Sequence, residues 1–264
     1  IVVLSVMNGF QKEVRDRMLG VLSHIELYAP GGEAIPDLAS VMATVKQHPE
    51  VVGVAPFVGA QALMARGEDM KGAIVRGIDP ALEPQVADLA KDLSQTVLPR
   101  LVPGEFGVIL GGELARSLGV GMGDTVTLIA PSGQVTPAGV VPRVRQMNVV
   151  GTFDSGHYEY DSALALLHQD DAARIFRVEG PTGVRIKIRD LHQAREVALS
   201  LAGQLPEGLL IKDWTRQNRS WFAAVQLEKR MMFIILTLIV AVAAFNLVST
   251  LVMTVTDKHA DIAI

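Results

Sequence analysis

The feature that most constrains this chain is a run of 26 residues without a charged side chain. It extends from Met231 to Thr256 and reads MMFIILTLIVAVAAFNLVSTLVMTVT. About 20 apolar residues in a helix are enough to cross the hydrocarbon core of a bilayer. The many Leu, Ile, Val and Phe residues outweigh the polar amide of Asn246 on insertion scales. The run therefore predicts a membrane-spanning helix, and the alternative is a helix buried in a protein core.

A second apolar stretch, IVVLSVMNGF, stands at the start of the chain. We expect it to be the tail of a first span, continued after Asn8 as an amphipathic stalk helix. Apolar side chains recur there at helical spacing, at Phe10, Val14, Met18, Val21 and Leu22. On the return side, residues 212–230 contain no Gly or Pro. They predict a second stalk helix, capped by Asp213, that leads into the span.

Composition excludes several classes of function. The 264 residues carry 24 Lys and Arg against 28 Asp and Glu, a net charge of −4 without a basic block. This balance argues against nucleic acid as a partner. The chain has no cysteine, so disulfides and thiolate metal sites are excluded. Its six histidines are scattered singly, whereas a zinc site favours paired histidines at helical spacing.

Enzyme signatures are equally weak. A phosphate-binding loop needs glycines followed by a lysine, and the chain contains no Gly-Lys pair. The glycines of GEFGVILGGE have the wrong spacing for such a loop. The segment DSGHYEYD, residues 154–161, contains the residue types of a hydrolase, but we interpret it as a solvated turn between strands. We expect no catalytic residue, no metal and no cofactor in this chain.

The order of elements predicts an α+β fold. Strands are expected over 21–29, 51–66, 71–78, 108–110 and 125–130, then over 143–153, 162–167 and 184–189. Helices are expected over 36–47, 81–93, 112–118, 170–178 and 191–204. We interpret the middle of the chain as a β-rich subdomain inserted into a first one.

This interpretation divides the chain as follows: 1–22, the end of a first membrane helix and its stalk; 23–95, the first part of subdomain 1; 96–160, the inserted subdomain; 161–212, the second part of subdomain 1; 213–256, the stalk and second membrane helix; and 257–264, the start of a cytoplasmic segment.

Residues 131–142 read PSGQVTPAGVVP, with three prolines, two glycines and no charge. A hairpin of twelve residues projects about 20 Å, at ~3.3 Å per residue. Its prolines lower the entropy lost on docking. An uncharged segment also enters an apolar cavity without the cost of desolvating ions. The sequence predicts a projection that another protein holds, and the alternative is a floppy surface loop.

The residues of this projection that we expect to contact the partner are Pro131, Val135, Thr136, Pro137, Ala138, Val140, Val141 and Pro142. At its base, Arg143 and Arg145 are expected to pair with carboxylates on the rim of the partner's cavity.

The stalks predict a second surface. We expect flexible apolar and aromatic side chains near the membrane interface. They are Met7, Phe10, Val14 and Met18 on one stalk, and Trp221, Phe222, Val225, Met231 and Met232 on the other. Methionine adapts to apolar shapes of different kinds, which suits lipid chains. Two alternatives stay open: the stalks pack against each other, or Trp221 is an interface anchor.

Both ends of the chain carry a family resemblance. The matching pieces are Met7-Asn8-Gly9-Phe10, Phe245-Asn246-Leu247-Val248-Ser249 and the exit Asp257-Lys258 with Asp261-Ile262-Ala263-Ile264. They closely resemble the lipoprotein-releasing transmembrane permeases of the Lol system, the LolC/LolE family. The turn Gly121-Met122-Gly123-Asp124 resembles the wider superfamily with a MacB-like periplasmic core. Residues 131–142 look like the hook of the LolC/LolF type.

The resemblance implies a four-span permease of an ABC transporter in the inner membrane of a Gram-negative bacterium. The large domain would lie in the periplasm, between the first two spans. The implied partners are a second permease, LolE-like or a second copy, and LolD-like ATPase chains that bind ATP and Mg. The complex would extract lipoproteins from the membrane and pass them to a LolA-like chaperone held by the hook.

Other functions fit the same outline. A related permease exports small molecules or peptides, and another acts as a signalling anchor that controls a cell-wall hydrolase without transport. Neither function calls for an uncharged hook. A membrane-tethered periplasmic enzyme is a third alternative, and it predicts a deep polar pocket lined by titratable groups.

Overall fold

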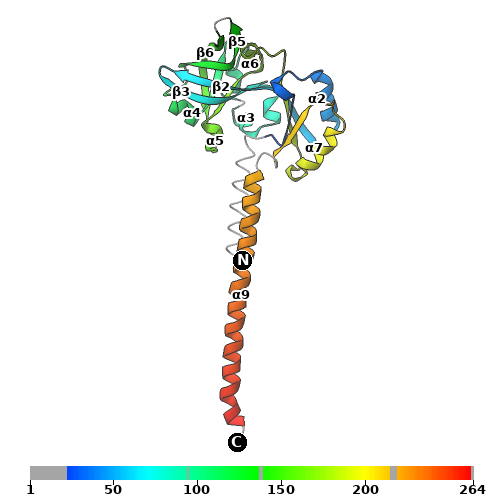
Figure 1. Ribbon diagram of the computed structural model, residues 1–264, viewed down its shortest axis with the longest axis vertical. Helices are drawn as coiled ribbons and strands as arrows, with labels where there is room; N and C mark the ends of the chain where they lie inside the picture. The colour runs from blue at the N-terminus through cyan, green and yellow to red at the C-terminus, as the bar shows by residue number, and fades with distance from the viewer. Residues whose placement is uncertain (1–22, 94, 137–138, 215–218, 263–264) are drawn as a thin grey trace. The chain divides into compact units, whose positions relative to one another are not determined.

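The computed structural model describes residues 23–93, 95–136, 139–214 and 219–262 (Figure 1). Its contacts divide the chain into two units, one that ends at Trp214 and one that starts at Thr215. The first unit carries the mixed α/β fold, as predicted. The second consists of helix α9, Arg219–Ile262.

Nine described strands form a mixed sheet in the first unit. They are β1 Ile25–Tyr28, β2 Val51–Arg66, β3 Asp69–Ile78, β4 Gly107–Gly111, β5 Thr125–Thr136, β6 Gly139–Phe153, β7 Leu164–His168, β8 Gly183–Ile188 and β9 Leu210–Asp213. Their order is β3-β7-β4-β6-β5-β2-β8-β1-β9. Because β3 also pairs with β2, six strands close into a ring, and β8, β1 and β9 extend the sheet from β2.

Short helices cover this sheet. They are α2 Leu38–Gln47, α3 Asp88–Leu93, α4 Gly112–Ser117, α5 Tyr158–Asp161, α6 Gln169–Phe176 and α7 Ala194–Ala202, with 3-10 turns η1 Pro30–Gly32, η2 Glu83–Gln85, η3 Leu98–Arg100 and η4 Leu191–Gln193. Helix α6 packs on β2, β3 and β5. Apolar side chains of these elements, including Met64, Leu128 and Met147, form a buried core beneath α4 and α6. Each such side chain contributes about 1.5–3 kcal/mol by its burial.

The predicted helix over residues 81–93 is wrong as a single element. The structure has the 3-10 turn η2 followed by the separate helix α3. Pro84 lies within η2 and lacks the N–H that an α-helix interior requires. Glu83 is buried and forms an ion pair with the buried Arg185 of β8. Loss of either partner would leave the other as a buried unpaired charge, so the pair holds η2 against β8.

The segment that leads into the second stalk contains a strand that was not predicted. Asp213, expected as the cap of the stalk helix, is the last residue of strand β9, which was not predicted, and the next residue, Trp214, is helical. Strand β9 pairs antiparallel with β1, with Ile25 opposite Asp213. The backbone hydrogen bonds of this sheet edge outweigh the helical pattern of the side chains. The predicted subdomain boundaries stay a prediction.

His24 lies at the junction where β1 begins. Its carbonyl accepts a hydrogen bond from Trp214 N at 3.1 Å, and its Nδ1 accepts one from Ile188 N at 3.2 Å. The side chain is buried. Burial and the nearby ammonium of Lys187 lower the pKa of His24 from 6.5 to about 4. His24 is therefore neutral in the folded protein at physiological pH.

Helix α9 contains the predicted membrane span. Residues Arg230–Thr256 are long and apolar enough to cross a bilayer. None of this stretch is buried against described residues, and Phe245, for example, is 74% exposed. A helix in the core of the described residues would be mostly buried, so the exposure favours the membrane span over that alternative. The hydroxyls of Thr237, Thr250 and Thr254 donate hydrogen bonds to the carbonyls four residues earlier, at 2.8 Å, so they carry no unsatisfied donor into the lipid.

The His24 junction predicts a pH-dependent stability. Below pH 6.5 the unfolded chain takes up a proton on His24, whereas the folded protein does so only near pH 4. The contribution of His24 is fully present above pH 6.5 and falls by about 3 kcal/mol as the pH drops to 4. Chemical unfolding of the purified protein in detergent, compared with His24→Gln, measures this difference. Parallel pH profiles of the two proteins would contradict the assignment.

If Arg230–Thr256 spans a membrane, the free energy cost of inserting a charged side chain should depend on its position in the helix. Val242→Arg places a guanidinium near the middle of the run and should raise the apparent free energy of membrane insertion by about 3 kcal/mol. Met231→Arg, at the end of the run, is the matched control and should cost much less because the side chain reaches the interface. Glycosylation mapping in microsomes measures both values. Equal costs at the two positions would argue against a transmembrane orientation.

Candidate functional site: the β5–β6 hairpin and its arginine-lined base

The region 131–142 is the outer part of a long β-hairpin that projects from the sheet (Figure 1). Strand β5 pairs with β2 only at Thr127–Ile129, and β6 pairs with β4 only from Asn148 onward. Beyond Ala130, β5 and β6 have no other strand neighbour among the described residues. The outer hairpin is therefore held by its own ladder.

Residues 131–142 were predicted as a loop between two strands, but the described part of this segment forms strands. Strand β5 continues to Thr136 and β6 starts at Gly139, with Val135 opposite Val140. The register shifts between Ala130 and Gln134, next to Pro131, which has no N–H for the ladder. The ladder resumes at residues with high strand propensity, which extends the hairpin as an ordered pair of strands.

Four arginines gather at the base of this hairpin. They line a hollow of about 320 Å³ together with apolar groups: Phe106, Arg143, Val144, Arg145, Arg174, Ile175 and Arg177. The guanidinium of Arg145 lies 3.6 Å from the centre of the Phe106 ring, a cation–π distance. Arg143 Nη1 donates a hydrogen bond to the carbonyl of Ile175 at 3.5 Å. The hollow therefore joins β6 to the end of α6.

The predicted residues occupy different parts of this site. Pro131 and Pro142 are exposed at the start of the outer hairpin, and Arg143 and Arg145 lie at its base. The backbone of Val135, Thr136, Val140 and Val141 is in strand conformation. Pro137 and Ala138 lie outside the described residues. Phe106, Arg174 and Arg177 line the hollow but were not predicted from the sequence. The available signal was the position of Arg174 and Arg177 near the end of the predicted helix 170–178.

The second predicted surface is described only in part. Met7, Phe10, Val14 and Met18 lie outside the described residues. Trp221, Phe222 and Val225 belong to helix α9, as do Met231, which is exposed, and Met232, which is half-buried. Contact with lipid chains stays a prediction.

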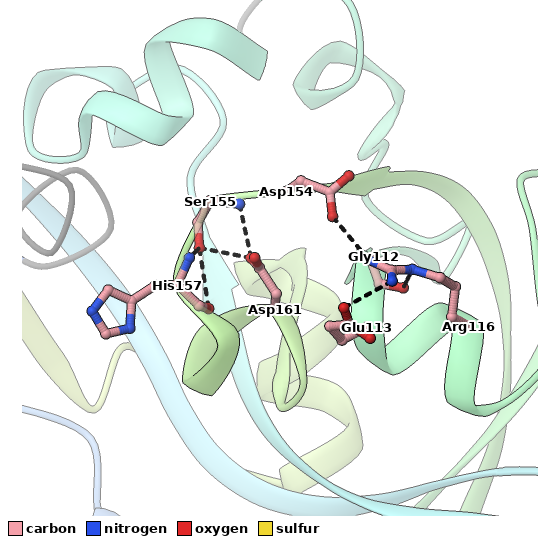
Figure 2. Close-up of polar contacts among 7 residues, drawn as sticks. All are labelled: Gly112, Glu113, Arg116, Asp154, Ser155, His157 and Asp161. Atoms are coloured by element: carbon pink, nitrogen blue, oxygen red, sulfur yellow. Dashed lines mark hydrogen bonds and ion pairs between the residues drawn. The ribbon is translucent and has the colours of Figure 1, made fainter.

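The segment 154–161 is a hydrogen-bonded turn that runs into the short helix α5, and its polar groups bond to one another rather than forming a nucleophile site (Figure 2). Ser155 Oγ donates to Asp161 Oδ1 at 2.6 Å, and Ser155 N donates to the same oxygen at 2.8 Å. The His157 ring contacts Tyr160, at 5.7 Å between ring centres, and Figure 2 shows it directed away from the serine. The turn is less solvated than expected, because Asp161 is buried.

Gly111 and Gly112 explain the glycine pattern that precedes this turn. A Cβ on Gly111 would lie 2.3 Å from the carbonyl oxygen of Asp161, and one on Gly112 would lie 2.2 Å from Asp154 Oδ1. Arg116, one turn along α4, forms ion pairs with Glu113 at 2.8 Å and with Asp154 at 3.5 Å (Figure 2). The glycine pair therefore permits close packing of α4 on the turn.

Comparison with known families decides the class of this fold. The profile of the MacB-like periplasmic core domain matches residues 1–202. The chain belongs to this family.

Within the MacB-like family, the chain is similar to lipoprotein-releasing proteins, as predicted from its two ends. It is 46% identical to "Lipoprotein-releasing system transmembrane protein LolC" of Neisseria meningitidis serogroup B, over 100% of this chain and 64% of the relative. It is 43% identical to the protein of the same name from Xylella fastidiosa, over 100% of this chain and 63% of the relative. The chain thus spans somewhat less than two thirds of these relatives.

One solved structure is also similar to this MacB-like chain. The periplasmic region of MacB from Actinobacillus actinomycetemcomitans aligns with a TM-score of 0.45 and 13% sequence identity, over 76% of this chain and 94% of that structure.

The close contact at Gly111 predicts a steric effect on stability. Gly111→Ala should reduce the free energy of unfolding by about 1–3 kcal/mol, because the added methyl group meets backbone rather than a movable side chain. Gly121→Ala is the matched control, since nothing lies within 4 Å of its Cβ position, and it should change stability by less than about 1 kcal/mol. Urea unfolding measures both; equal effects would refute the packing argument.

Proposed function

We propose that this chain is part of a permease subunit of an ABC transporter that releases lipoproteins from the inner membrane. Its hairpin would bind a periplasmic chaperone that accepts the lipoprotein. The observation that carries this proposal is the projecting β5–β6 pair, whose twelve outer residues, 131–142, carry no charge. The relatives named for the lipoprotein-releasing system support the same function.

The shape of the hairpin supports a docking role. An ordered ladder loses less conformational entropy on binding than a flexible loop does. Uncharged side chains enter an apolar cavity without ion desolvation. Arg143 and Arg145 stand where the hairpin leaves the sheet, so carboxylates on the rim of the cavity would meet them. The partner that fits is therefore an apolar cavity with an acidic rim.

The transporter would divide its work among chains. ATP binding and hydrolysis are assigned to separate ATPase subunits, and the mechanical contribution of this chain is to link the membrane helix to the chaperone. A second permease subunit, of the same or a related kind, would complete the membrane path. Lipoproteins would reach the chaperone with their lipid chains shielded from water, because the exposure of such chains is costly.

The export of small molecules or peptides is the alternative within the same family. It requires neither an uncharged projection nor a chaperone. A membrane-tethered enzyme requires converging titratable groups, and in the described residues the segment 154–161 forms a structural turn instead.

Hairpin variants test the proposed function. Pro137→Gly should weaken the capture of the periplasmic chaperone by raising the entropy lost on docking, and Arg145→Glu should weaken it by charge repulsion. We expect about a tenfold effect for Arg145→Glu, about 1.4 kcal/mol. The measurement is chaperone affinity of the membrane-inserted protein in nanodiscs. Deletion of residues 132–141 should abolish capture and stop lipoprotein release.

Lys212→Glu, a charge reversal on the distant strand β9, is the control and should leave chaperone affinity unchanged. Full capture and full release by the deletion variant would rule out the hairpin as the docking element.

A further inference from the structure

We infer that Phe106 and Asp171 are positioning residues for the hollow at the hairpin base, and that Arg174 and Arg177 of the α6 end bind carboxylates of the partner there. This inference rests on the proposed function and names chemistry on both sides of that interface. It concerns two segments, 104–106 and 171–177, that are remote in sequence from the hairpin.

Phe106 is the platform of the hollow. The Arg145 guanidinium lies 3.6 Å from the centre of its ring, so the charged group is stacked on the ring rather than free to rotate in solvent. A stacked guanidinium keeps its N–H donors available around its edge. The ring thereby presents Arg145 in one orientation for a planar carboxylate.

Asp171 holds Phe106 in place. Its carboxylate is fully buried and accepts hydrogen bonds from Gly104 N at 2.8 Å and from Phe106 N at 3.2 Å. Phe106 has a φ of 53°, a left-handed conformation that is unfavourable for a bulky residue. Asn148 N donates to the carbonyl of Phe106 at 3.0 Å and closes the segment on its other side. The surrounding bonds therefore impose a backbone conformation that Phe106 would not adopt by itself.

The end of helix α6 contributes the other two arginines of the hollow, Arg174 and Arg177. Arg174 is exposed and lies 3.9 Å from Asp171, and Arg177 ends the helix in a left-handed conformation, with a φ of 52°. Both line the same hollow as Arg143 and Arg145. Four guanidinium groups around one hollow repel each other unless an anion neutralises them.

The hollow lacks its own counter-charge. Among the residues that the structure describes, the buried Asp171 is the only carboxylate within 4 Å of any of these four guanidinium groups, and it meets Arg174 alone. Arg143 Nε is buried without a hydrogen-bond partner in the same described set. A buried donor without a partner favours the arrival of an acceptor. Carboxylates of a docked protein supply both the charge and the acceptor.

Chaperone affinity of the membrane-inserted protein, measured in nanodiscs at about 0.05 M and about 0.5 M salt, tests the inference. Phe106→Leu keeps the apolar volume but removes the aromatic face, and it should weaken binding about 2- to 5-fold. Phe106→Tyr keeps the face and should restore affinity. Phe57→Leu is the control and should bind like the wild type, because Arg76 lies over the Phe57 ring, 5.9 Å from its centre, but Phe57 does not line this hollow.

A double-mutant cycle separates positioning from general stability. In the Arg145→Gln background, Phe106→Leu should have no further effect on affinity, because the stacked group is gone. If Phe106→Leu weakens binding equally in both backgrounds, its role is structural and the positioning claim is wrong. Unchanged affinity of Phe106→Leu in the wild-type background would overturn it as well.

Charge removal tests the α6 arginines. Arg174→Gln combined with Arg177→Asn should weaken binding about tenfold at low salt and much less at high salt. Asparagine is chosen at position 177 because it tolerates the left-handed backbone. Arg195→Gln, an exposed arginine of α7, is the matched control. Equal affinities for the double variant and this control would exclude the α6 end from the interface.

A hexaglutamate peptide serves as a second probe that needs no chaperone. If the wild-type protein binds the peptide with the same dependence on Phe106 and Arg174 but does not bind the chaperone, the proposed function fails and the inference about the hollow stands. If it binds neither probe, both are refuted.

Discussion

Strand β2 is hydrogen-bonded along its 16 residues to β8, β3 and β5, and the rest of the folded unit depends on these pairings. Its first half belongs to the open part of the sheet and its second half to the six-stranded ring. A strand shared in this way fixes the position of β5 relative to β1 and β9. The base of the hairpin is consequently placed by the sheet, and only its outer part is left to its own ladder.

Much of the fold could be predicted because its signals are local. The segment 125–130 was predicted as a strand and forms the first half of β5, and the uncharged run predicted the membrane helix. The single helix predicted over 81–93 was wrong because Pro84 lies in the 3-10 turn η2, and the ion pair of Glu83 with Arg185 is a distant contact that periodicity does not reveal. Strand β9 was missed because its four residues form a strand only through β1, which lies far away in the sequence.

The candidate site also combines features that a short sequence window reveals with features that only the fold creates. The hairpin could be predicted from its prolines, its glycines and its lack of charge. The stacking of Arg145 on Phe106 could not, because the two residues meet only after β4 and β6 have paired. The pattern around Arg174 and Arg177 looks like ordinary basic residues near the end of a helix. Tertiary contact turns them into part of a cluster, and no short window of sequence contains that information.

The pairing of β1 with β9 has a mechanical consequence. The chain enters the sheet at Ile25 and leaves it at Asp213, and these two residues stand opposite each other at the same end of two antiparallel strands. Forces that move both connections in the same direction displace the sheet as a rigid body without loading the bonds between the two strands. Forces that draw the connections apart would break those bonds one pair at a time, starting with the bond from Trp214 N to the His24 carbonyl. The β1–β9 edge thus resists forces that move the two connections together and yields more easily to forces that separate them.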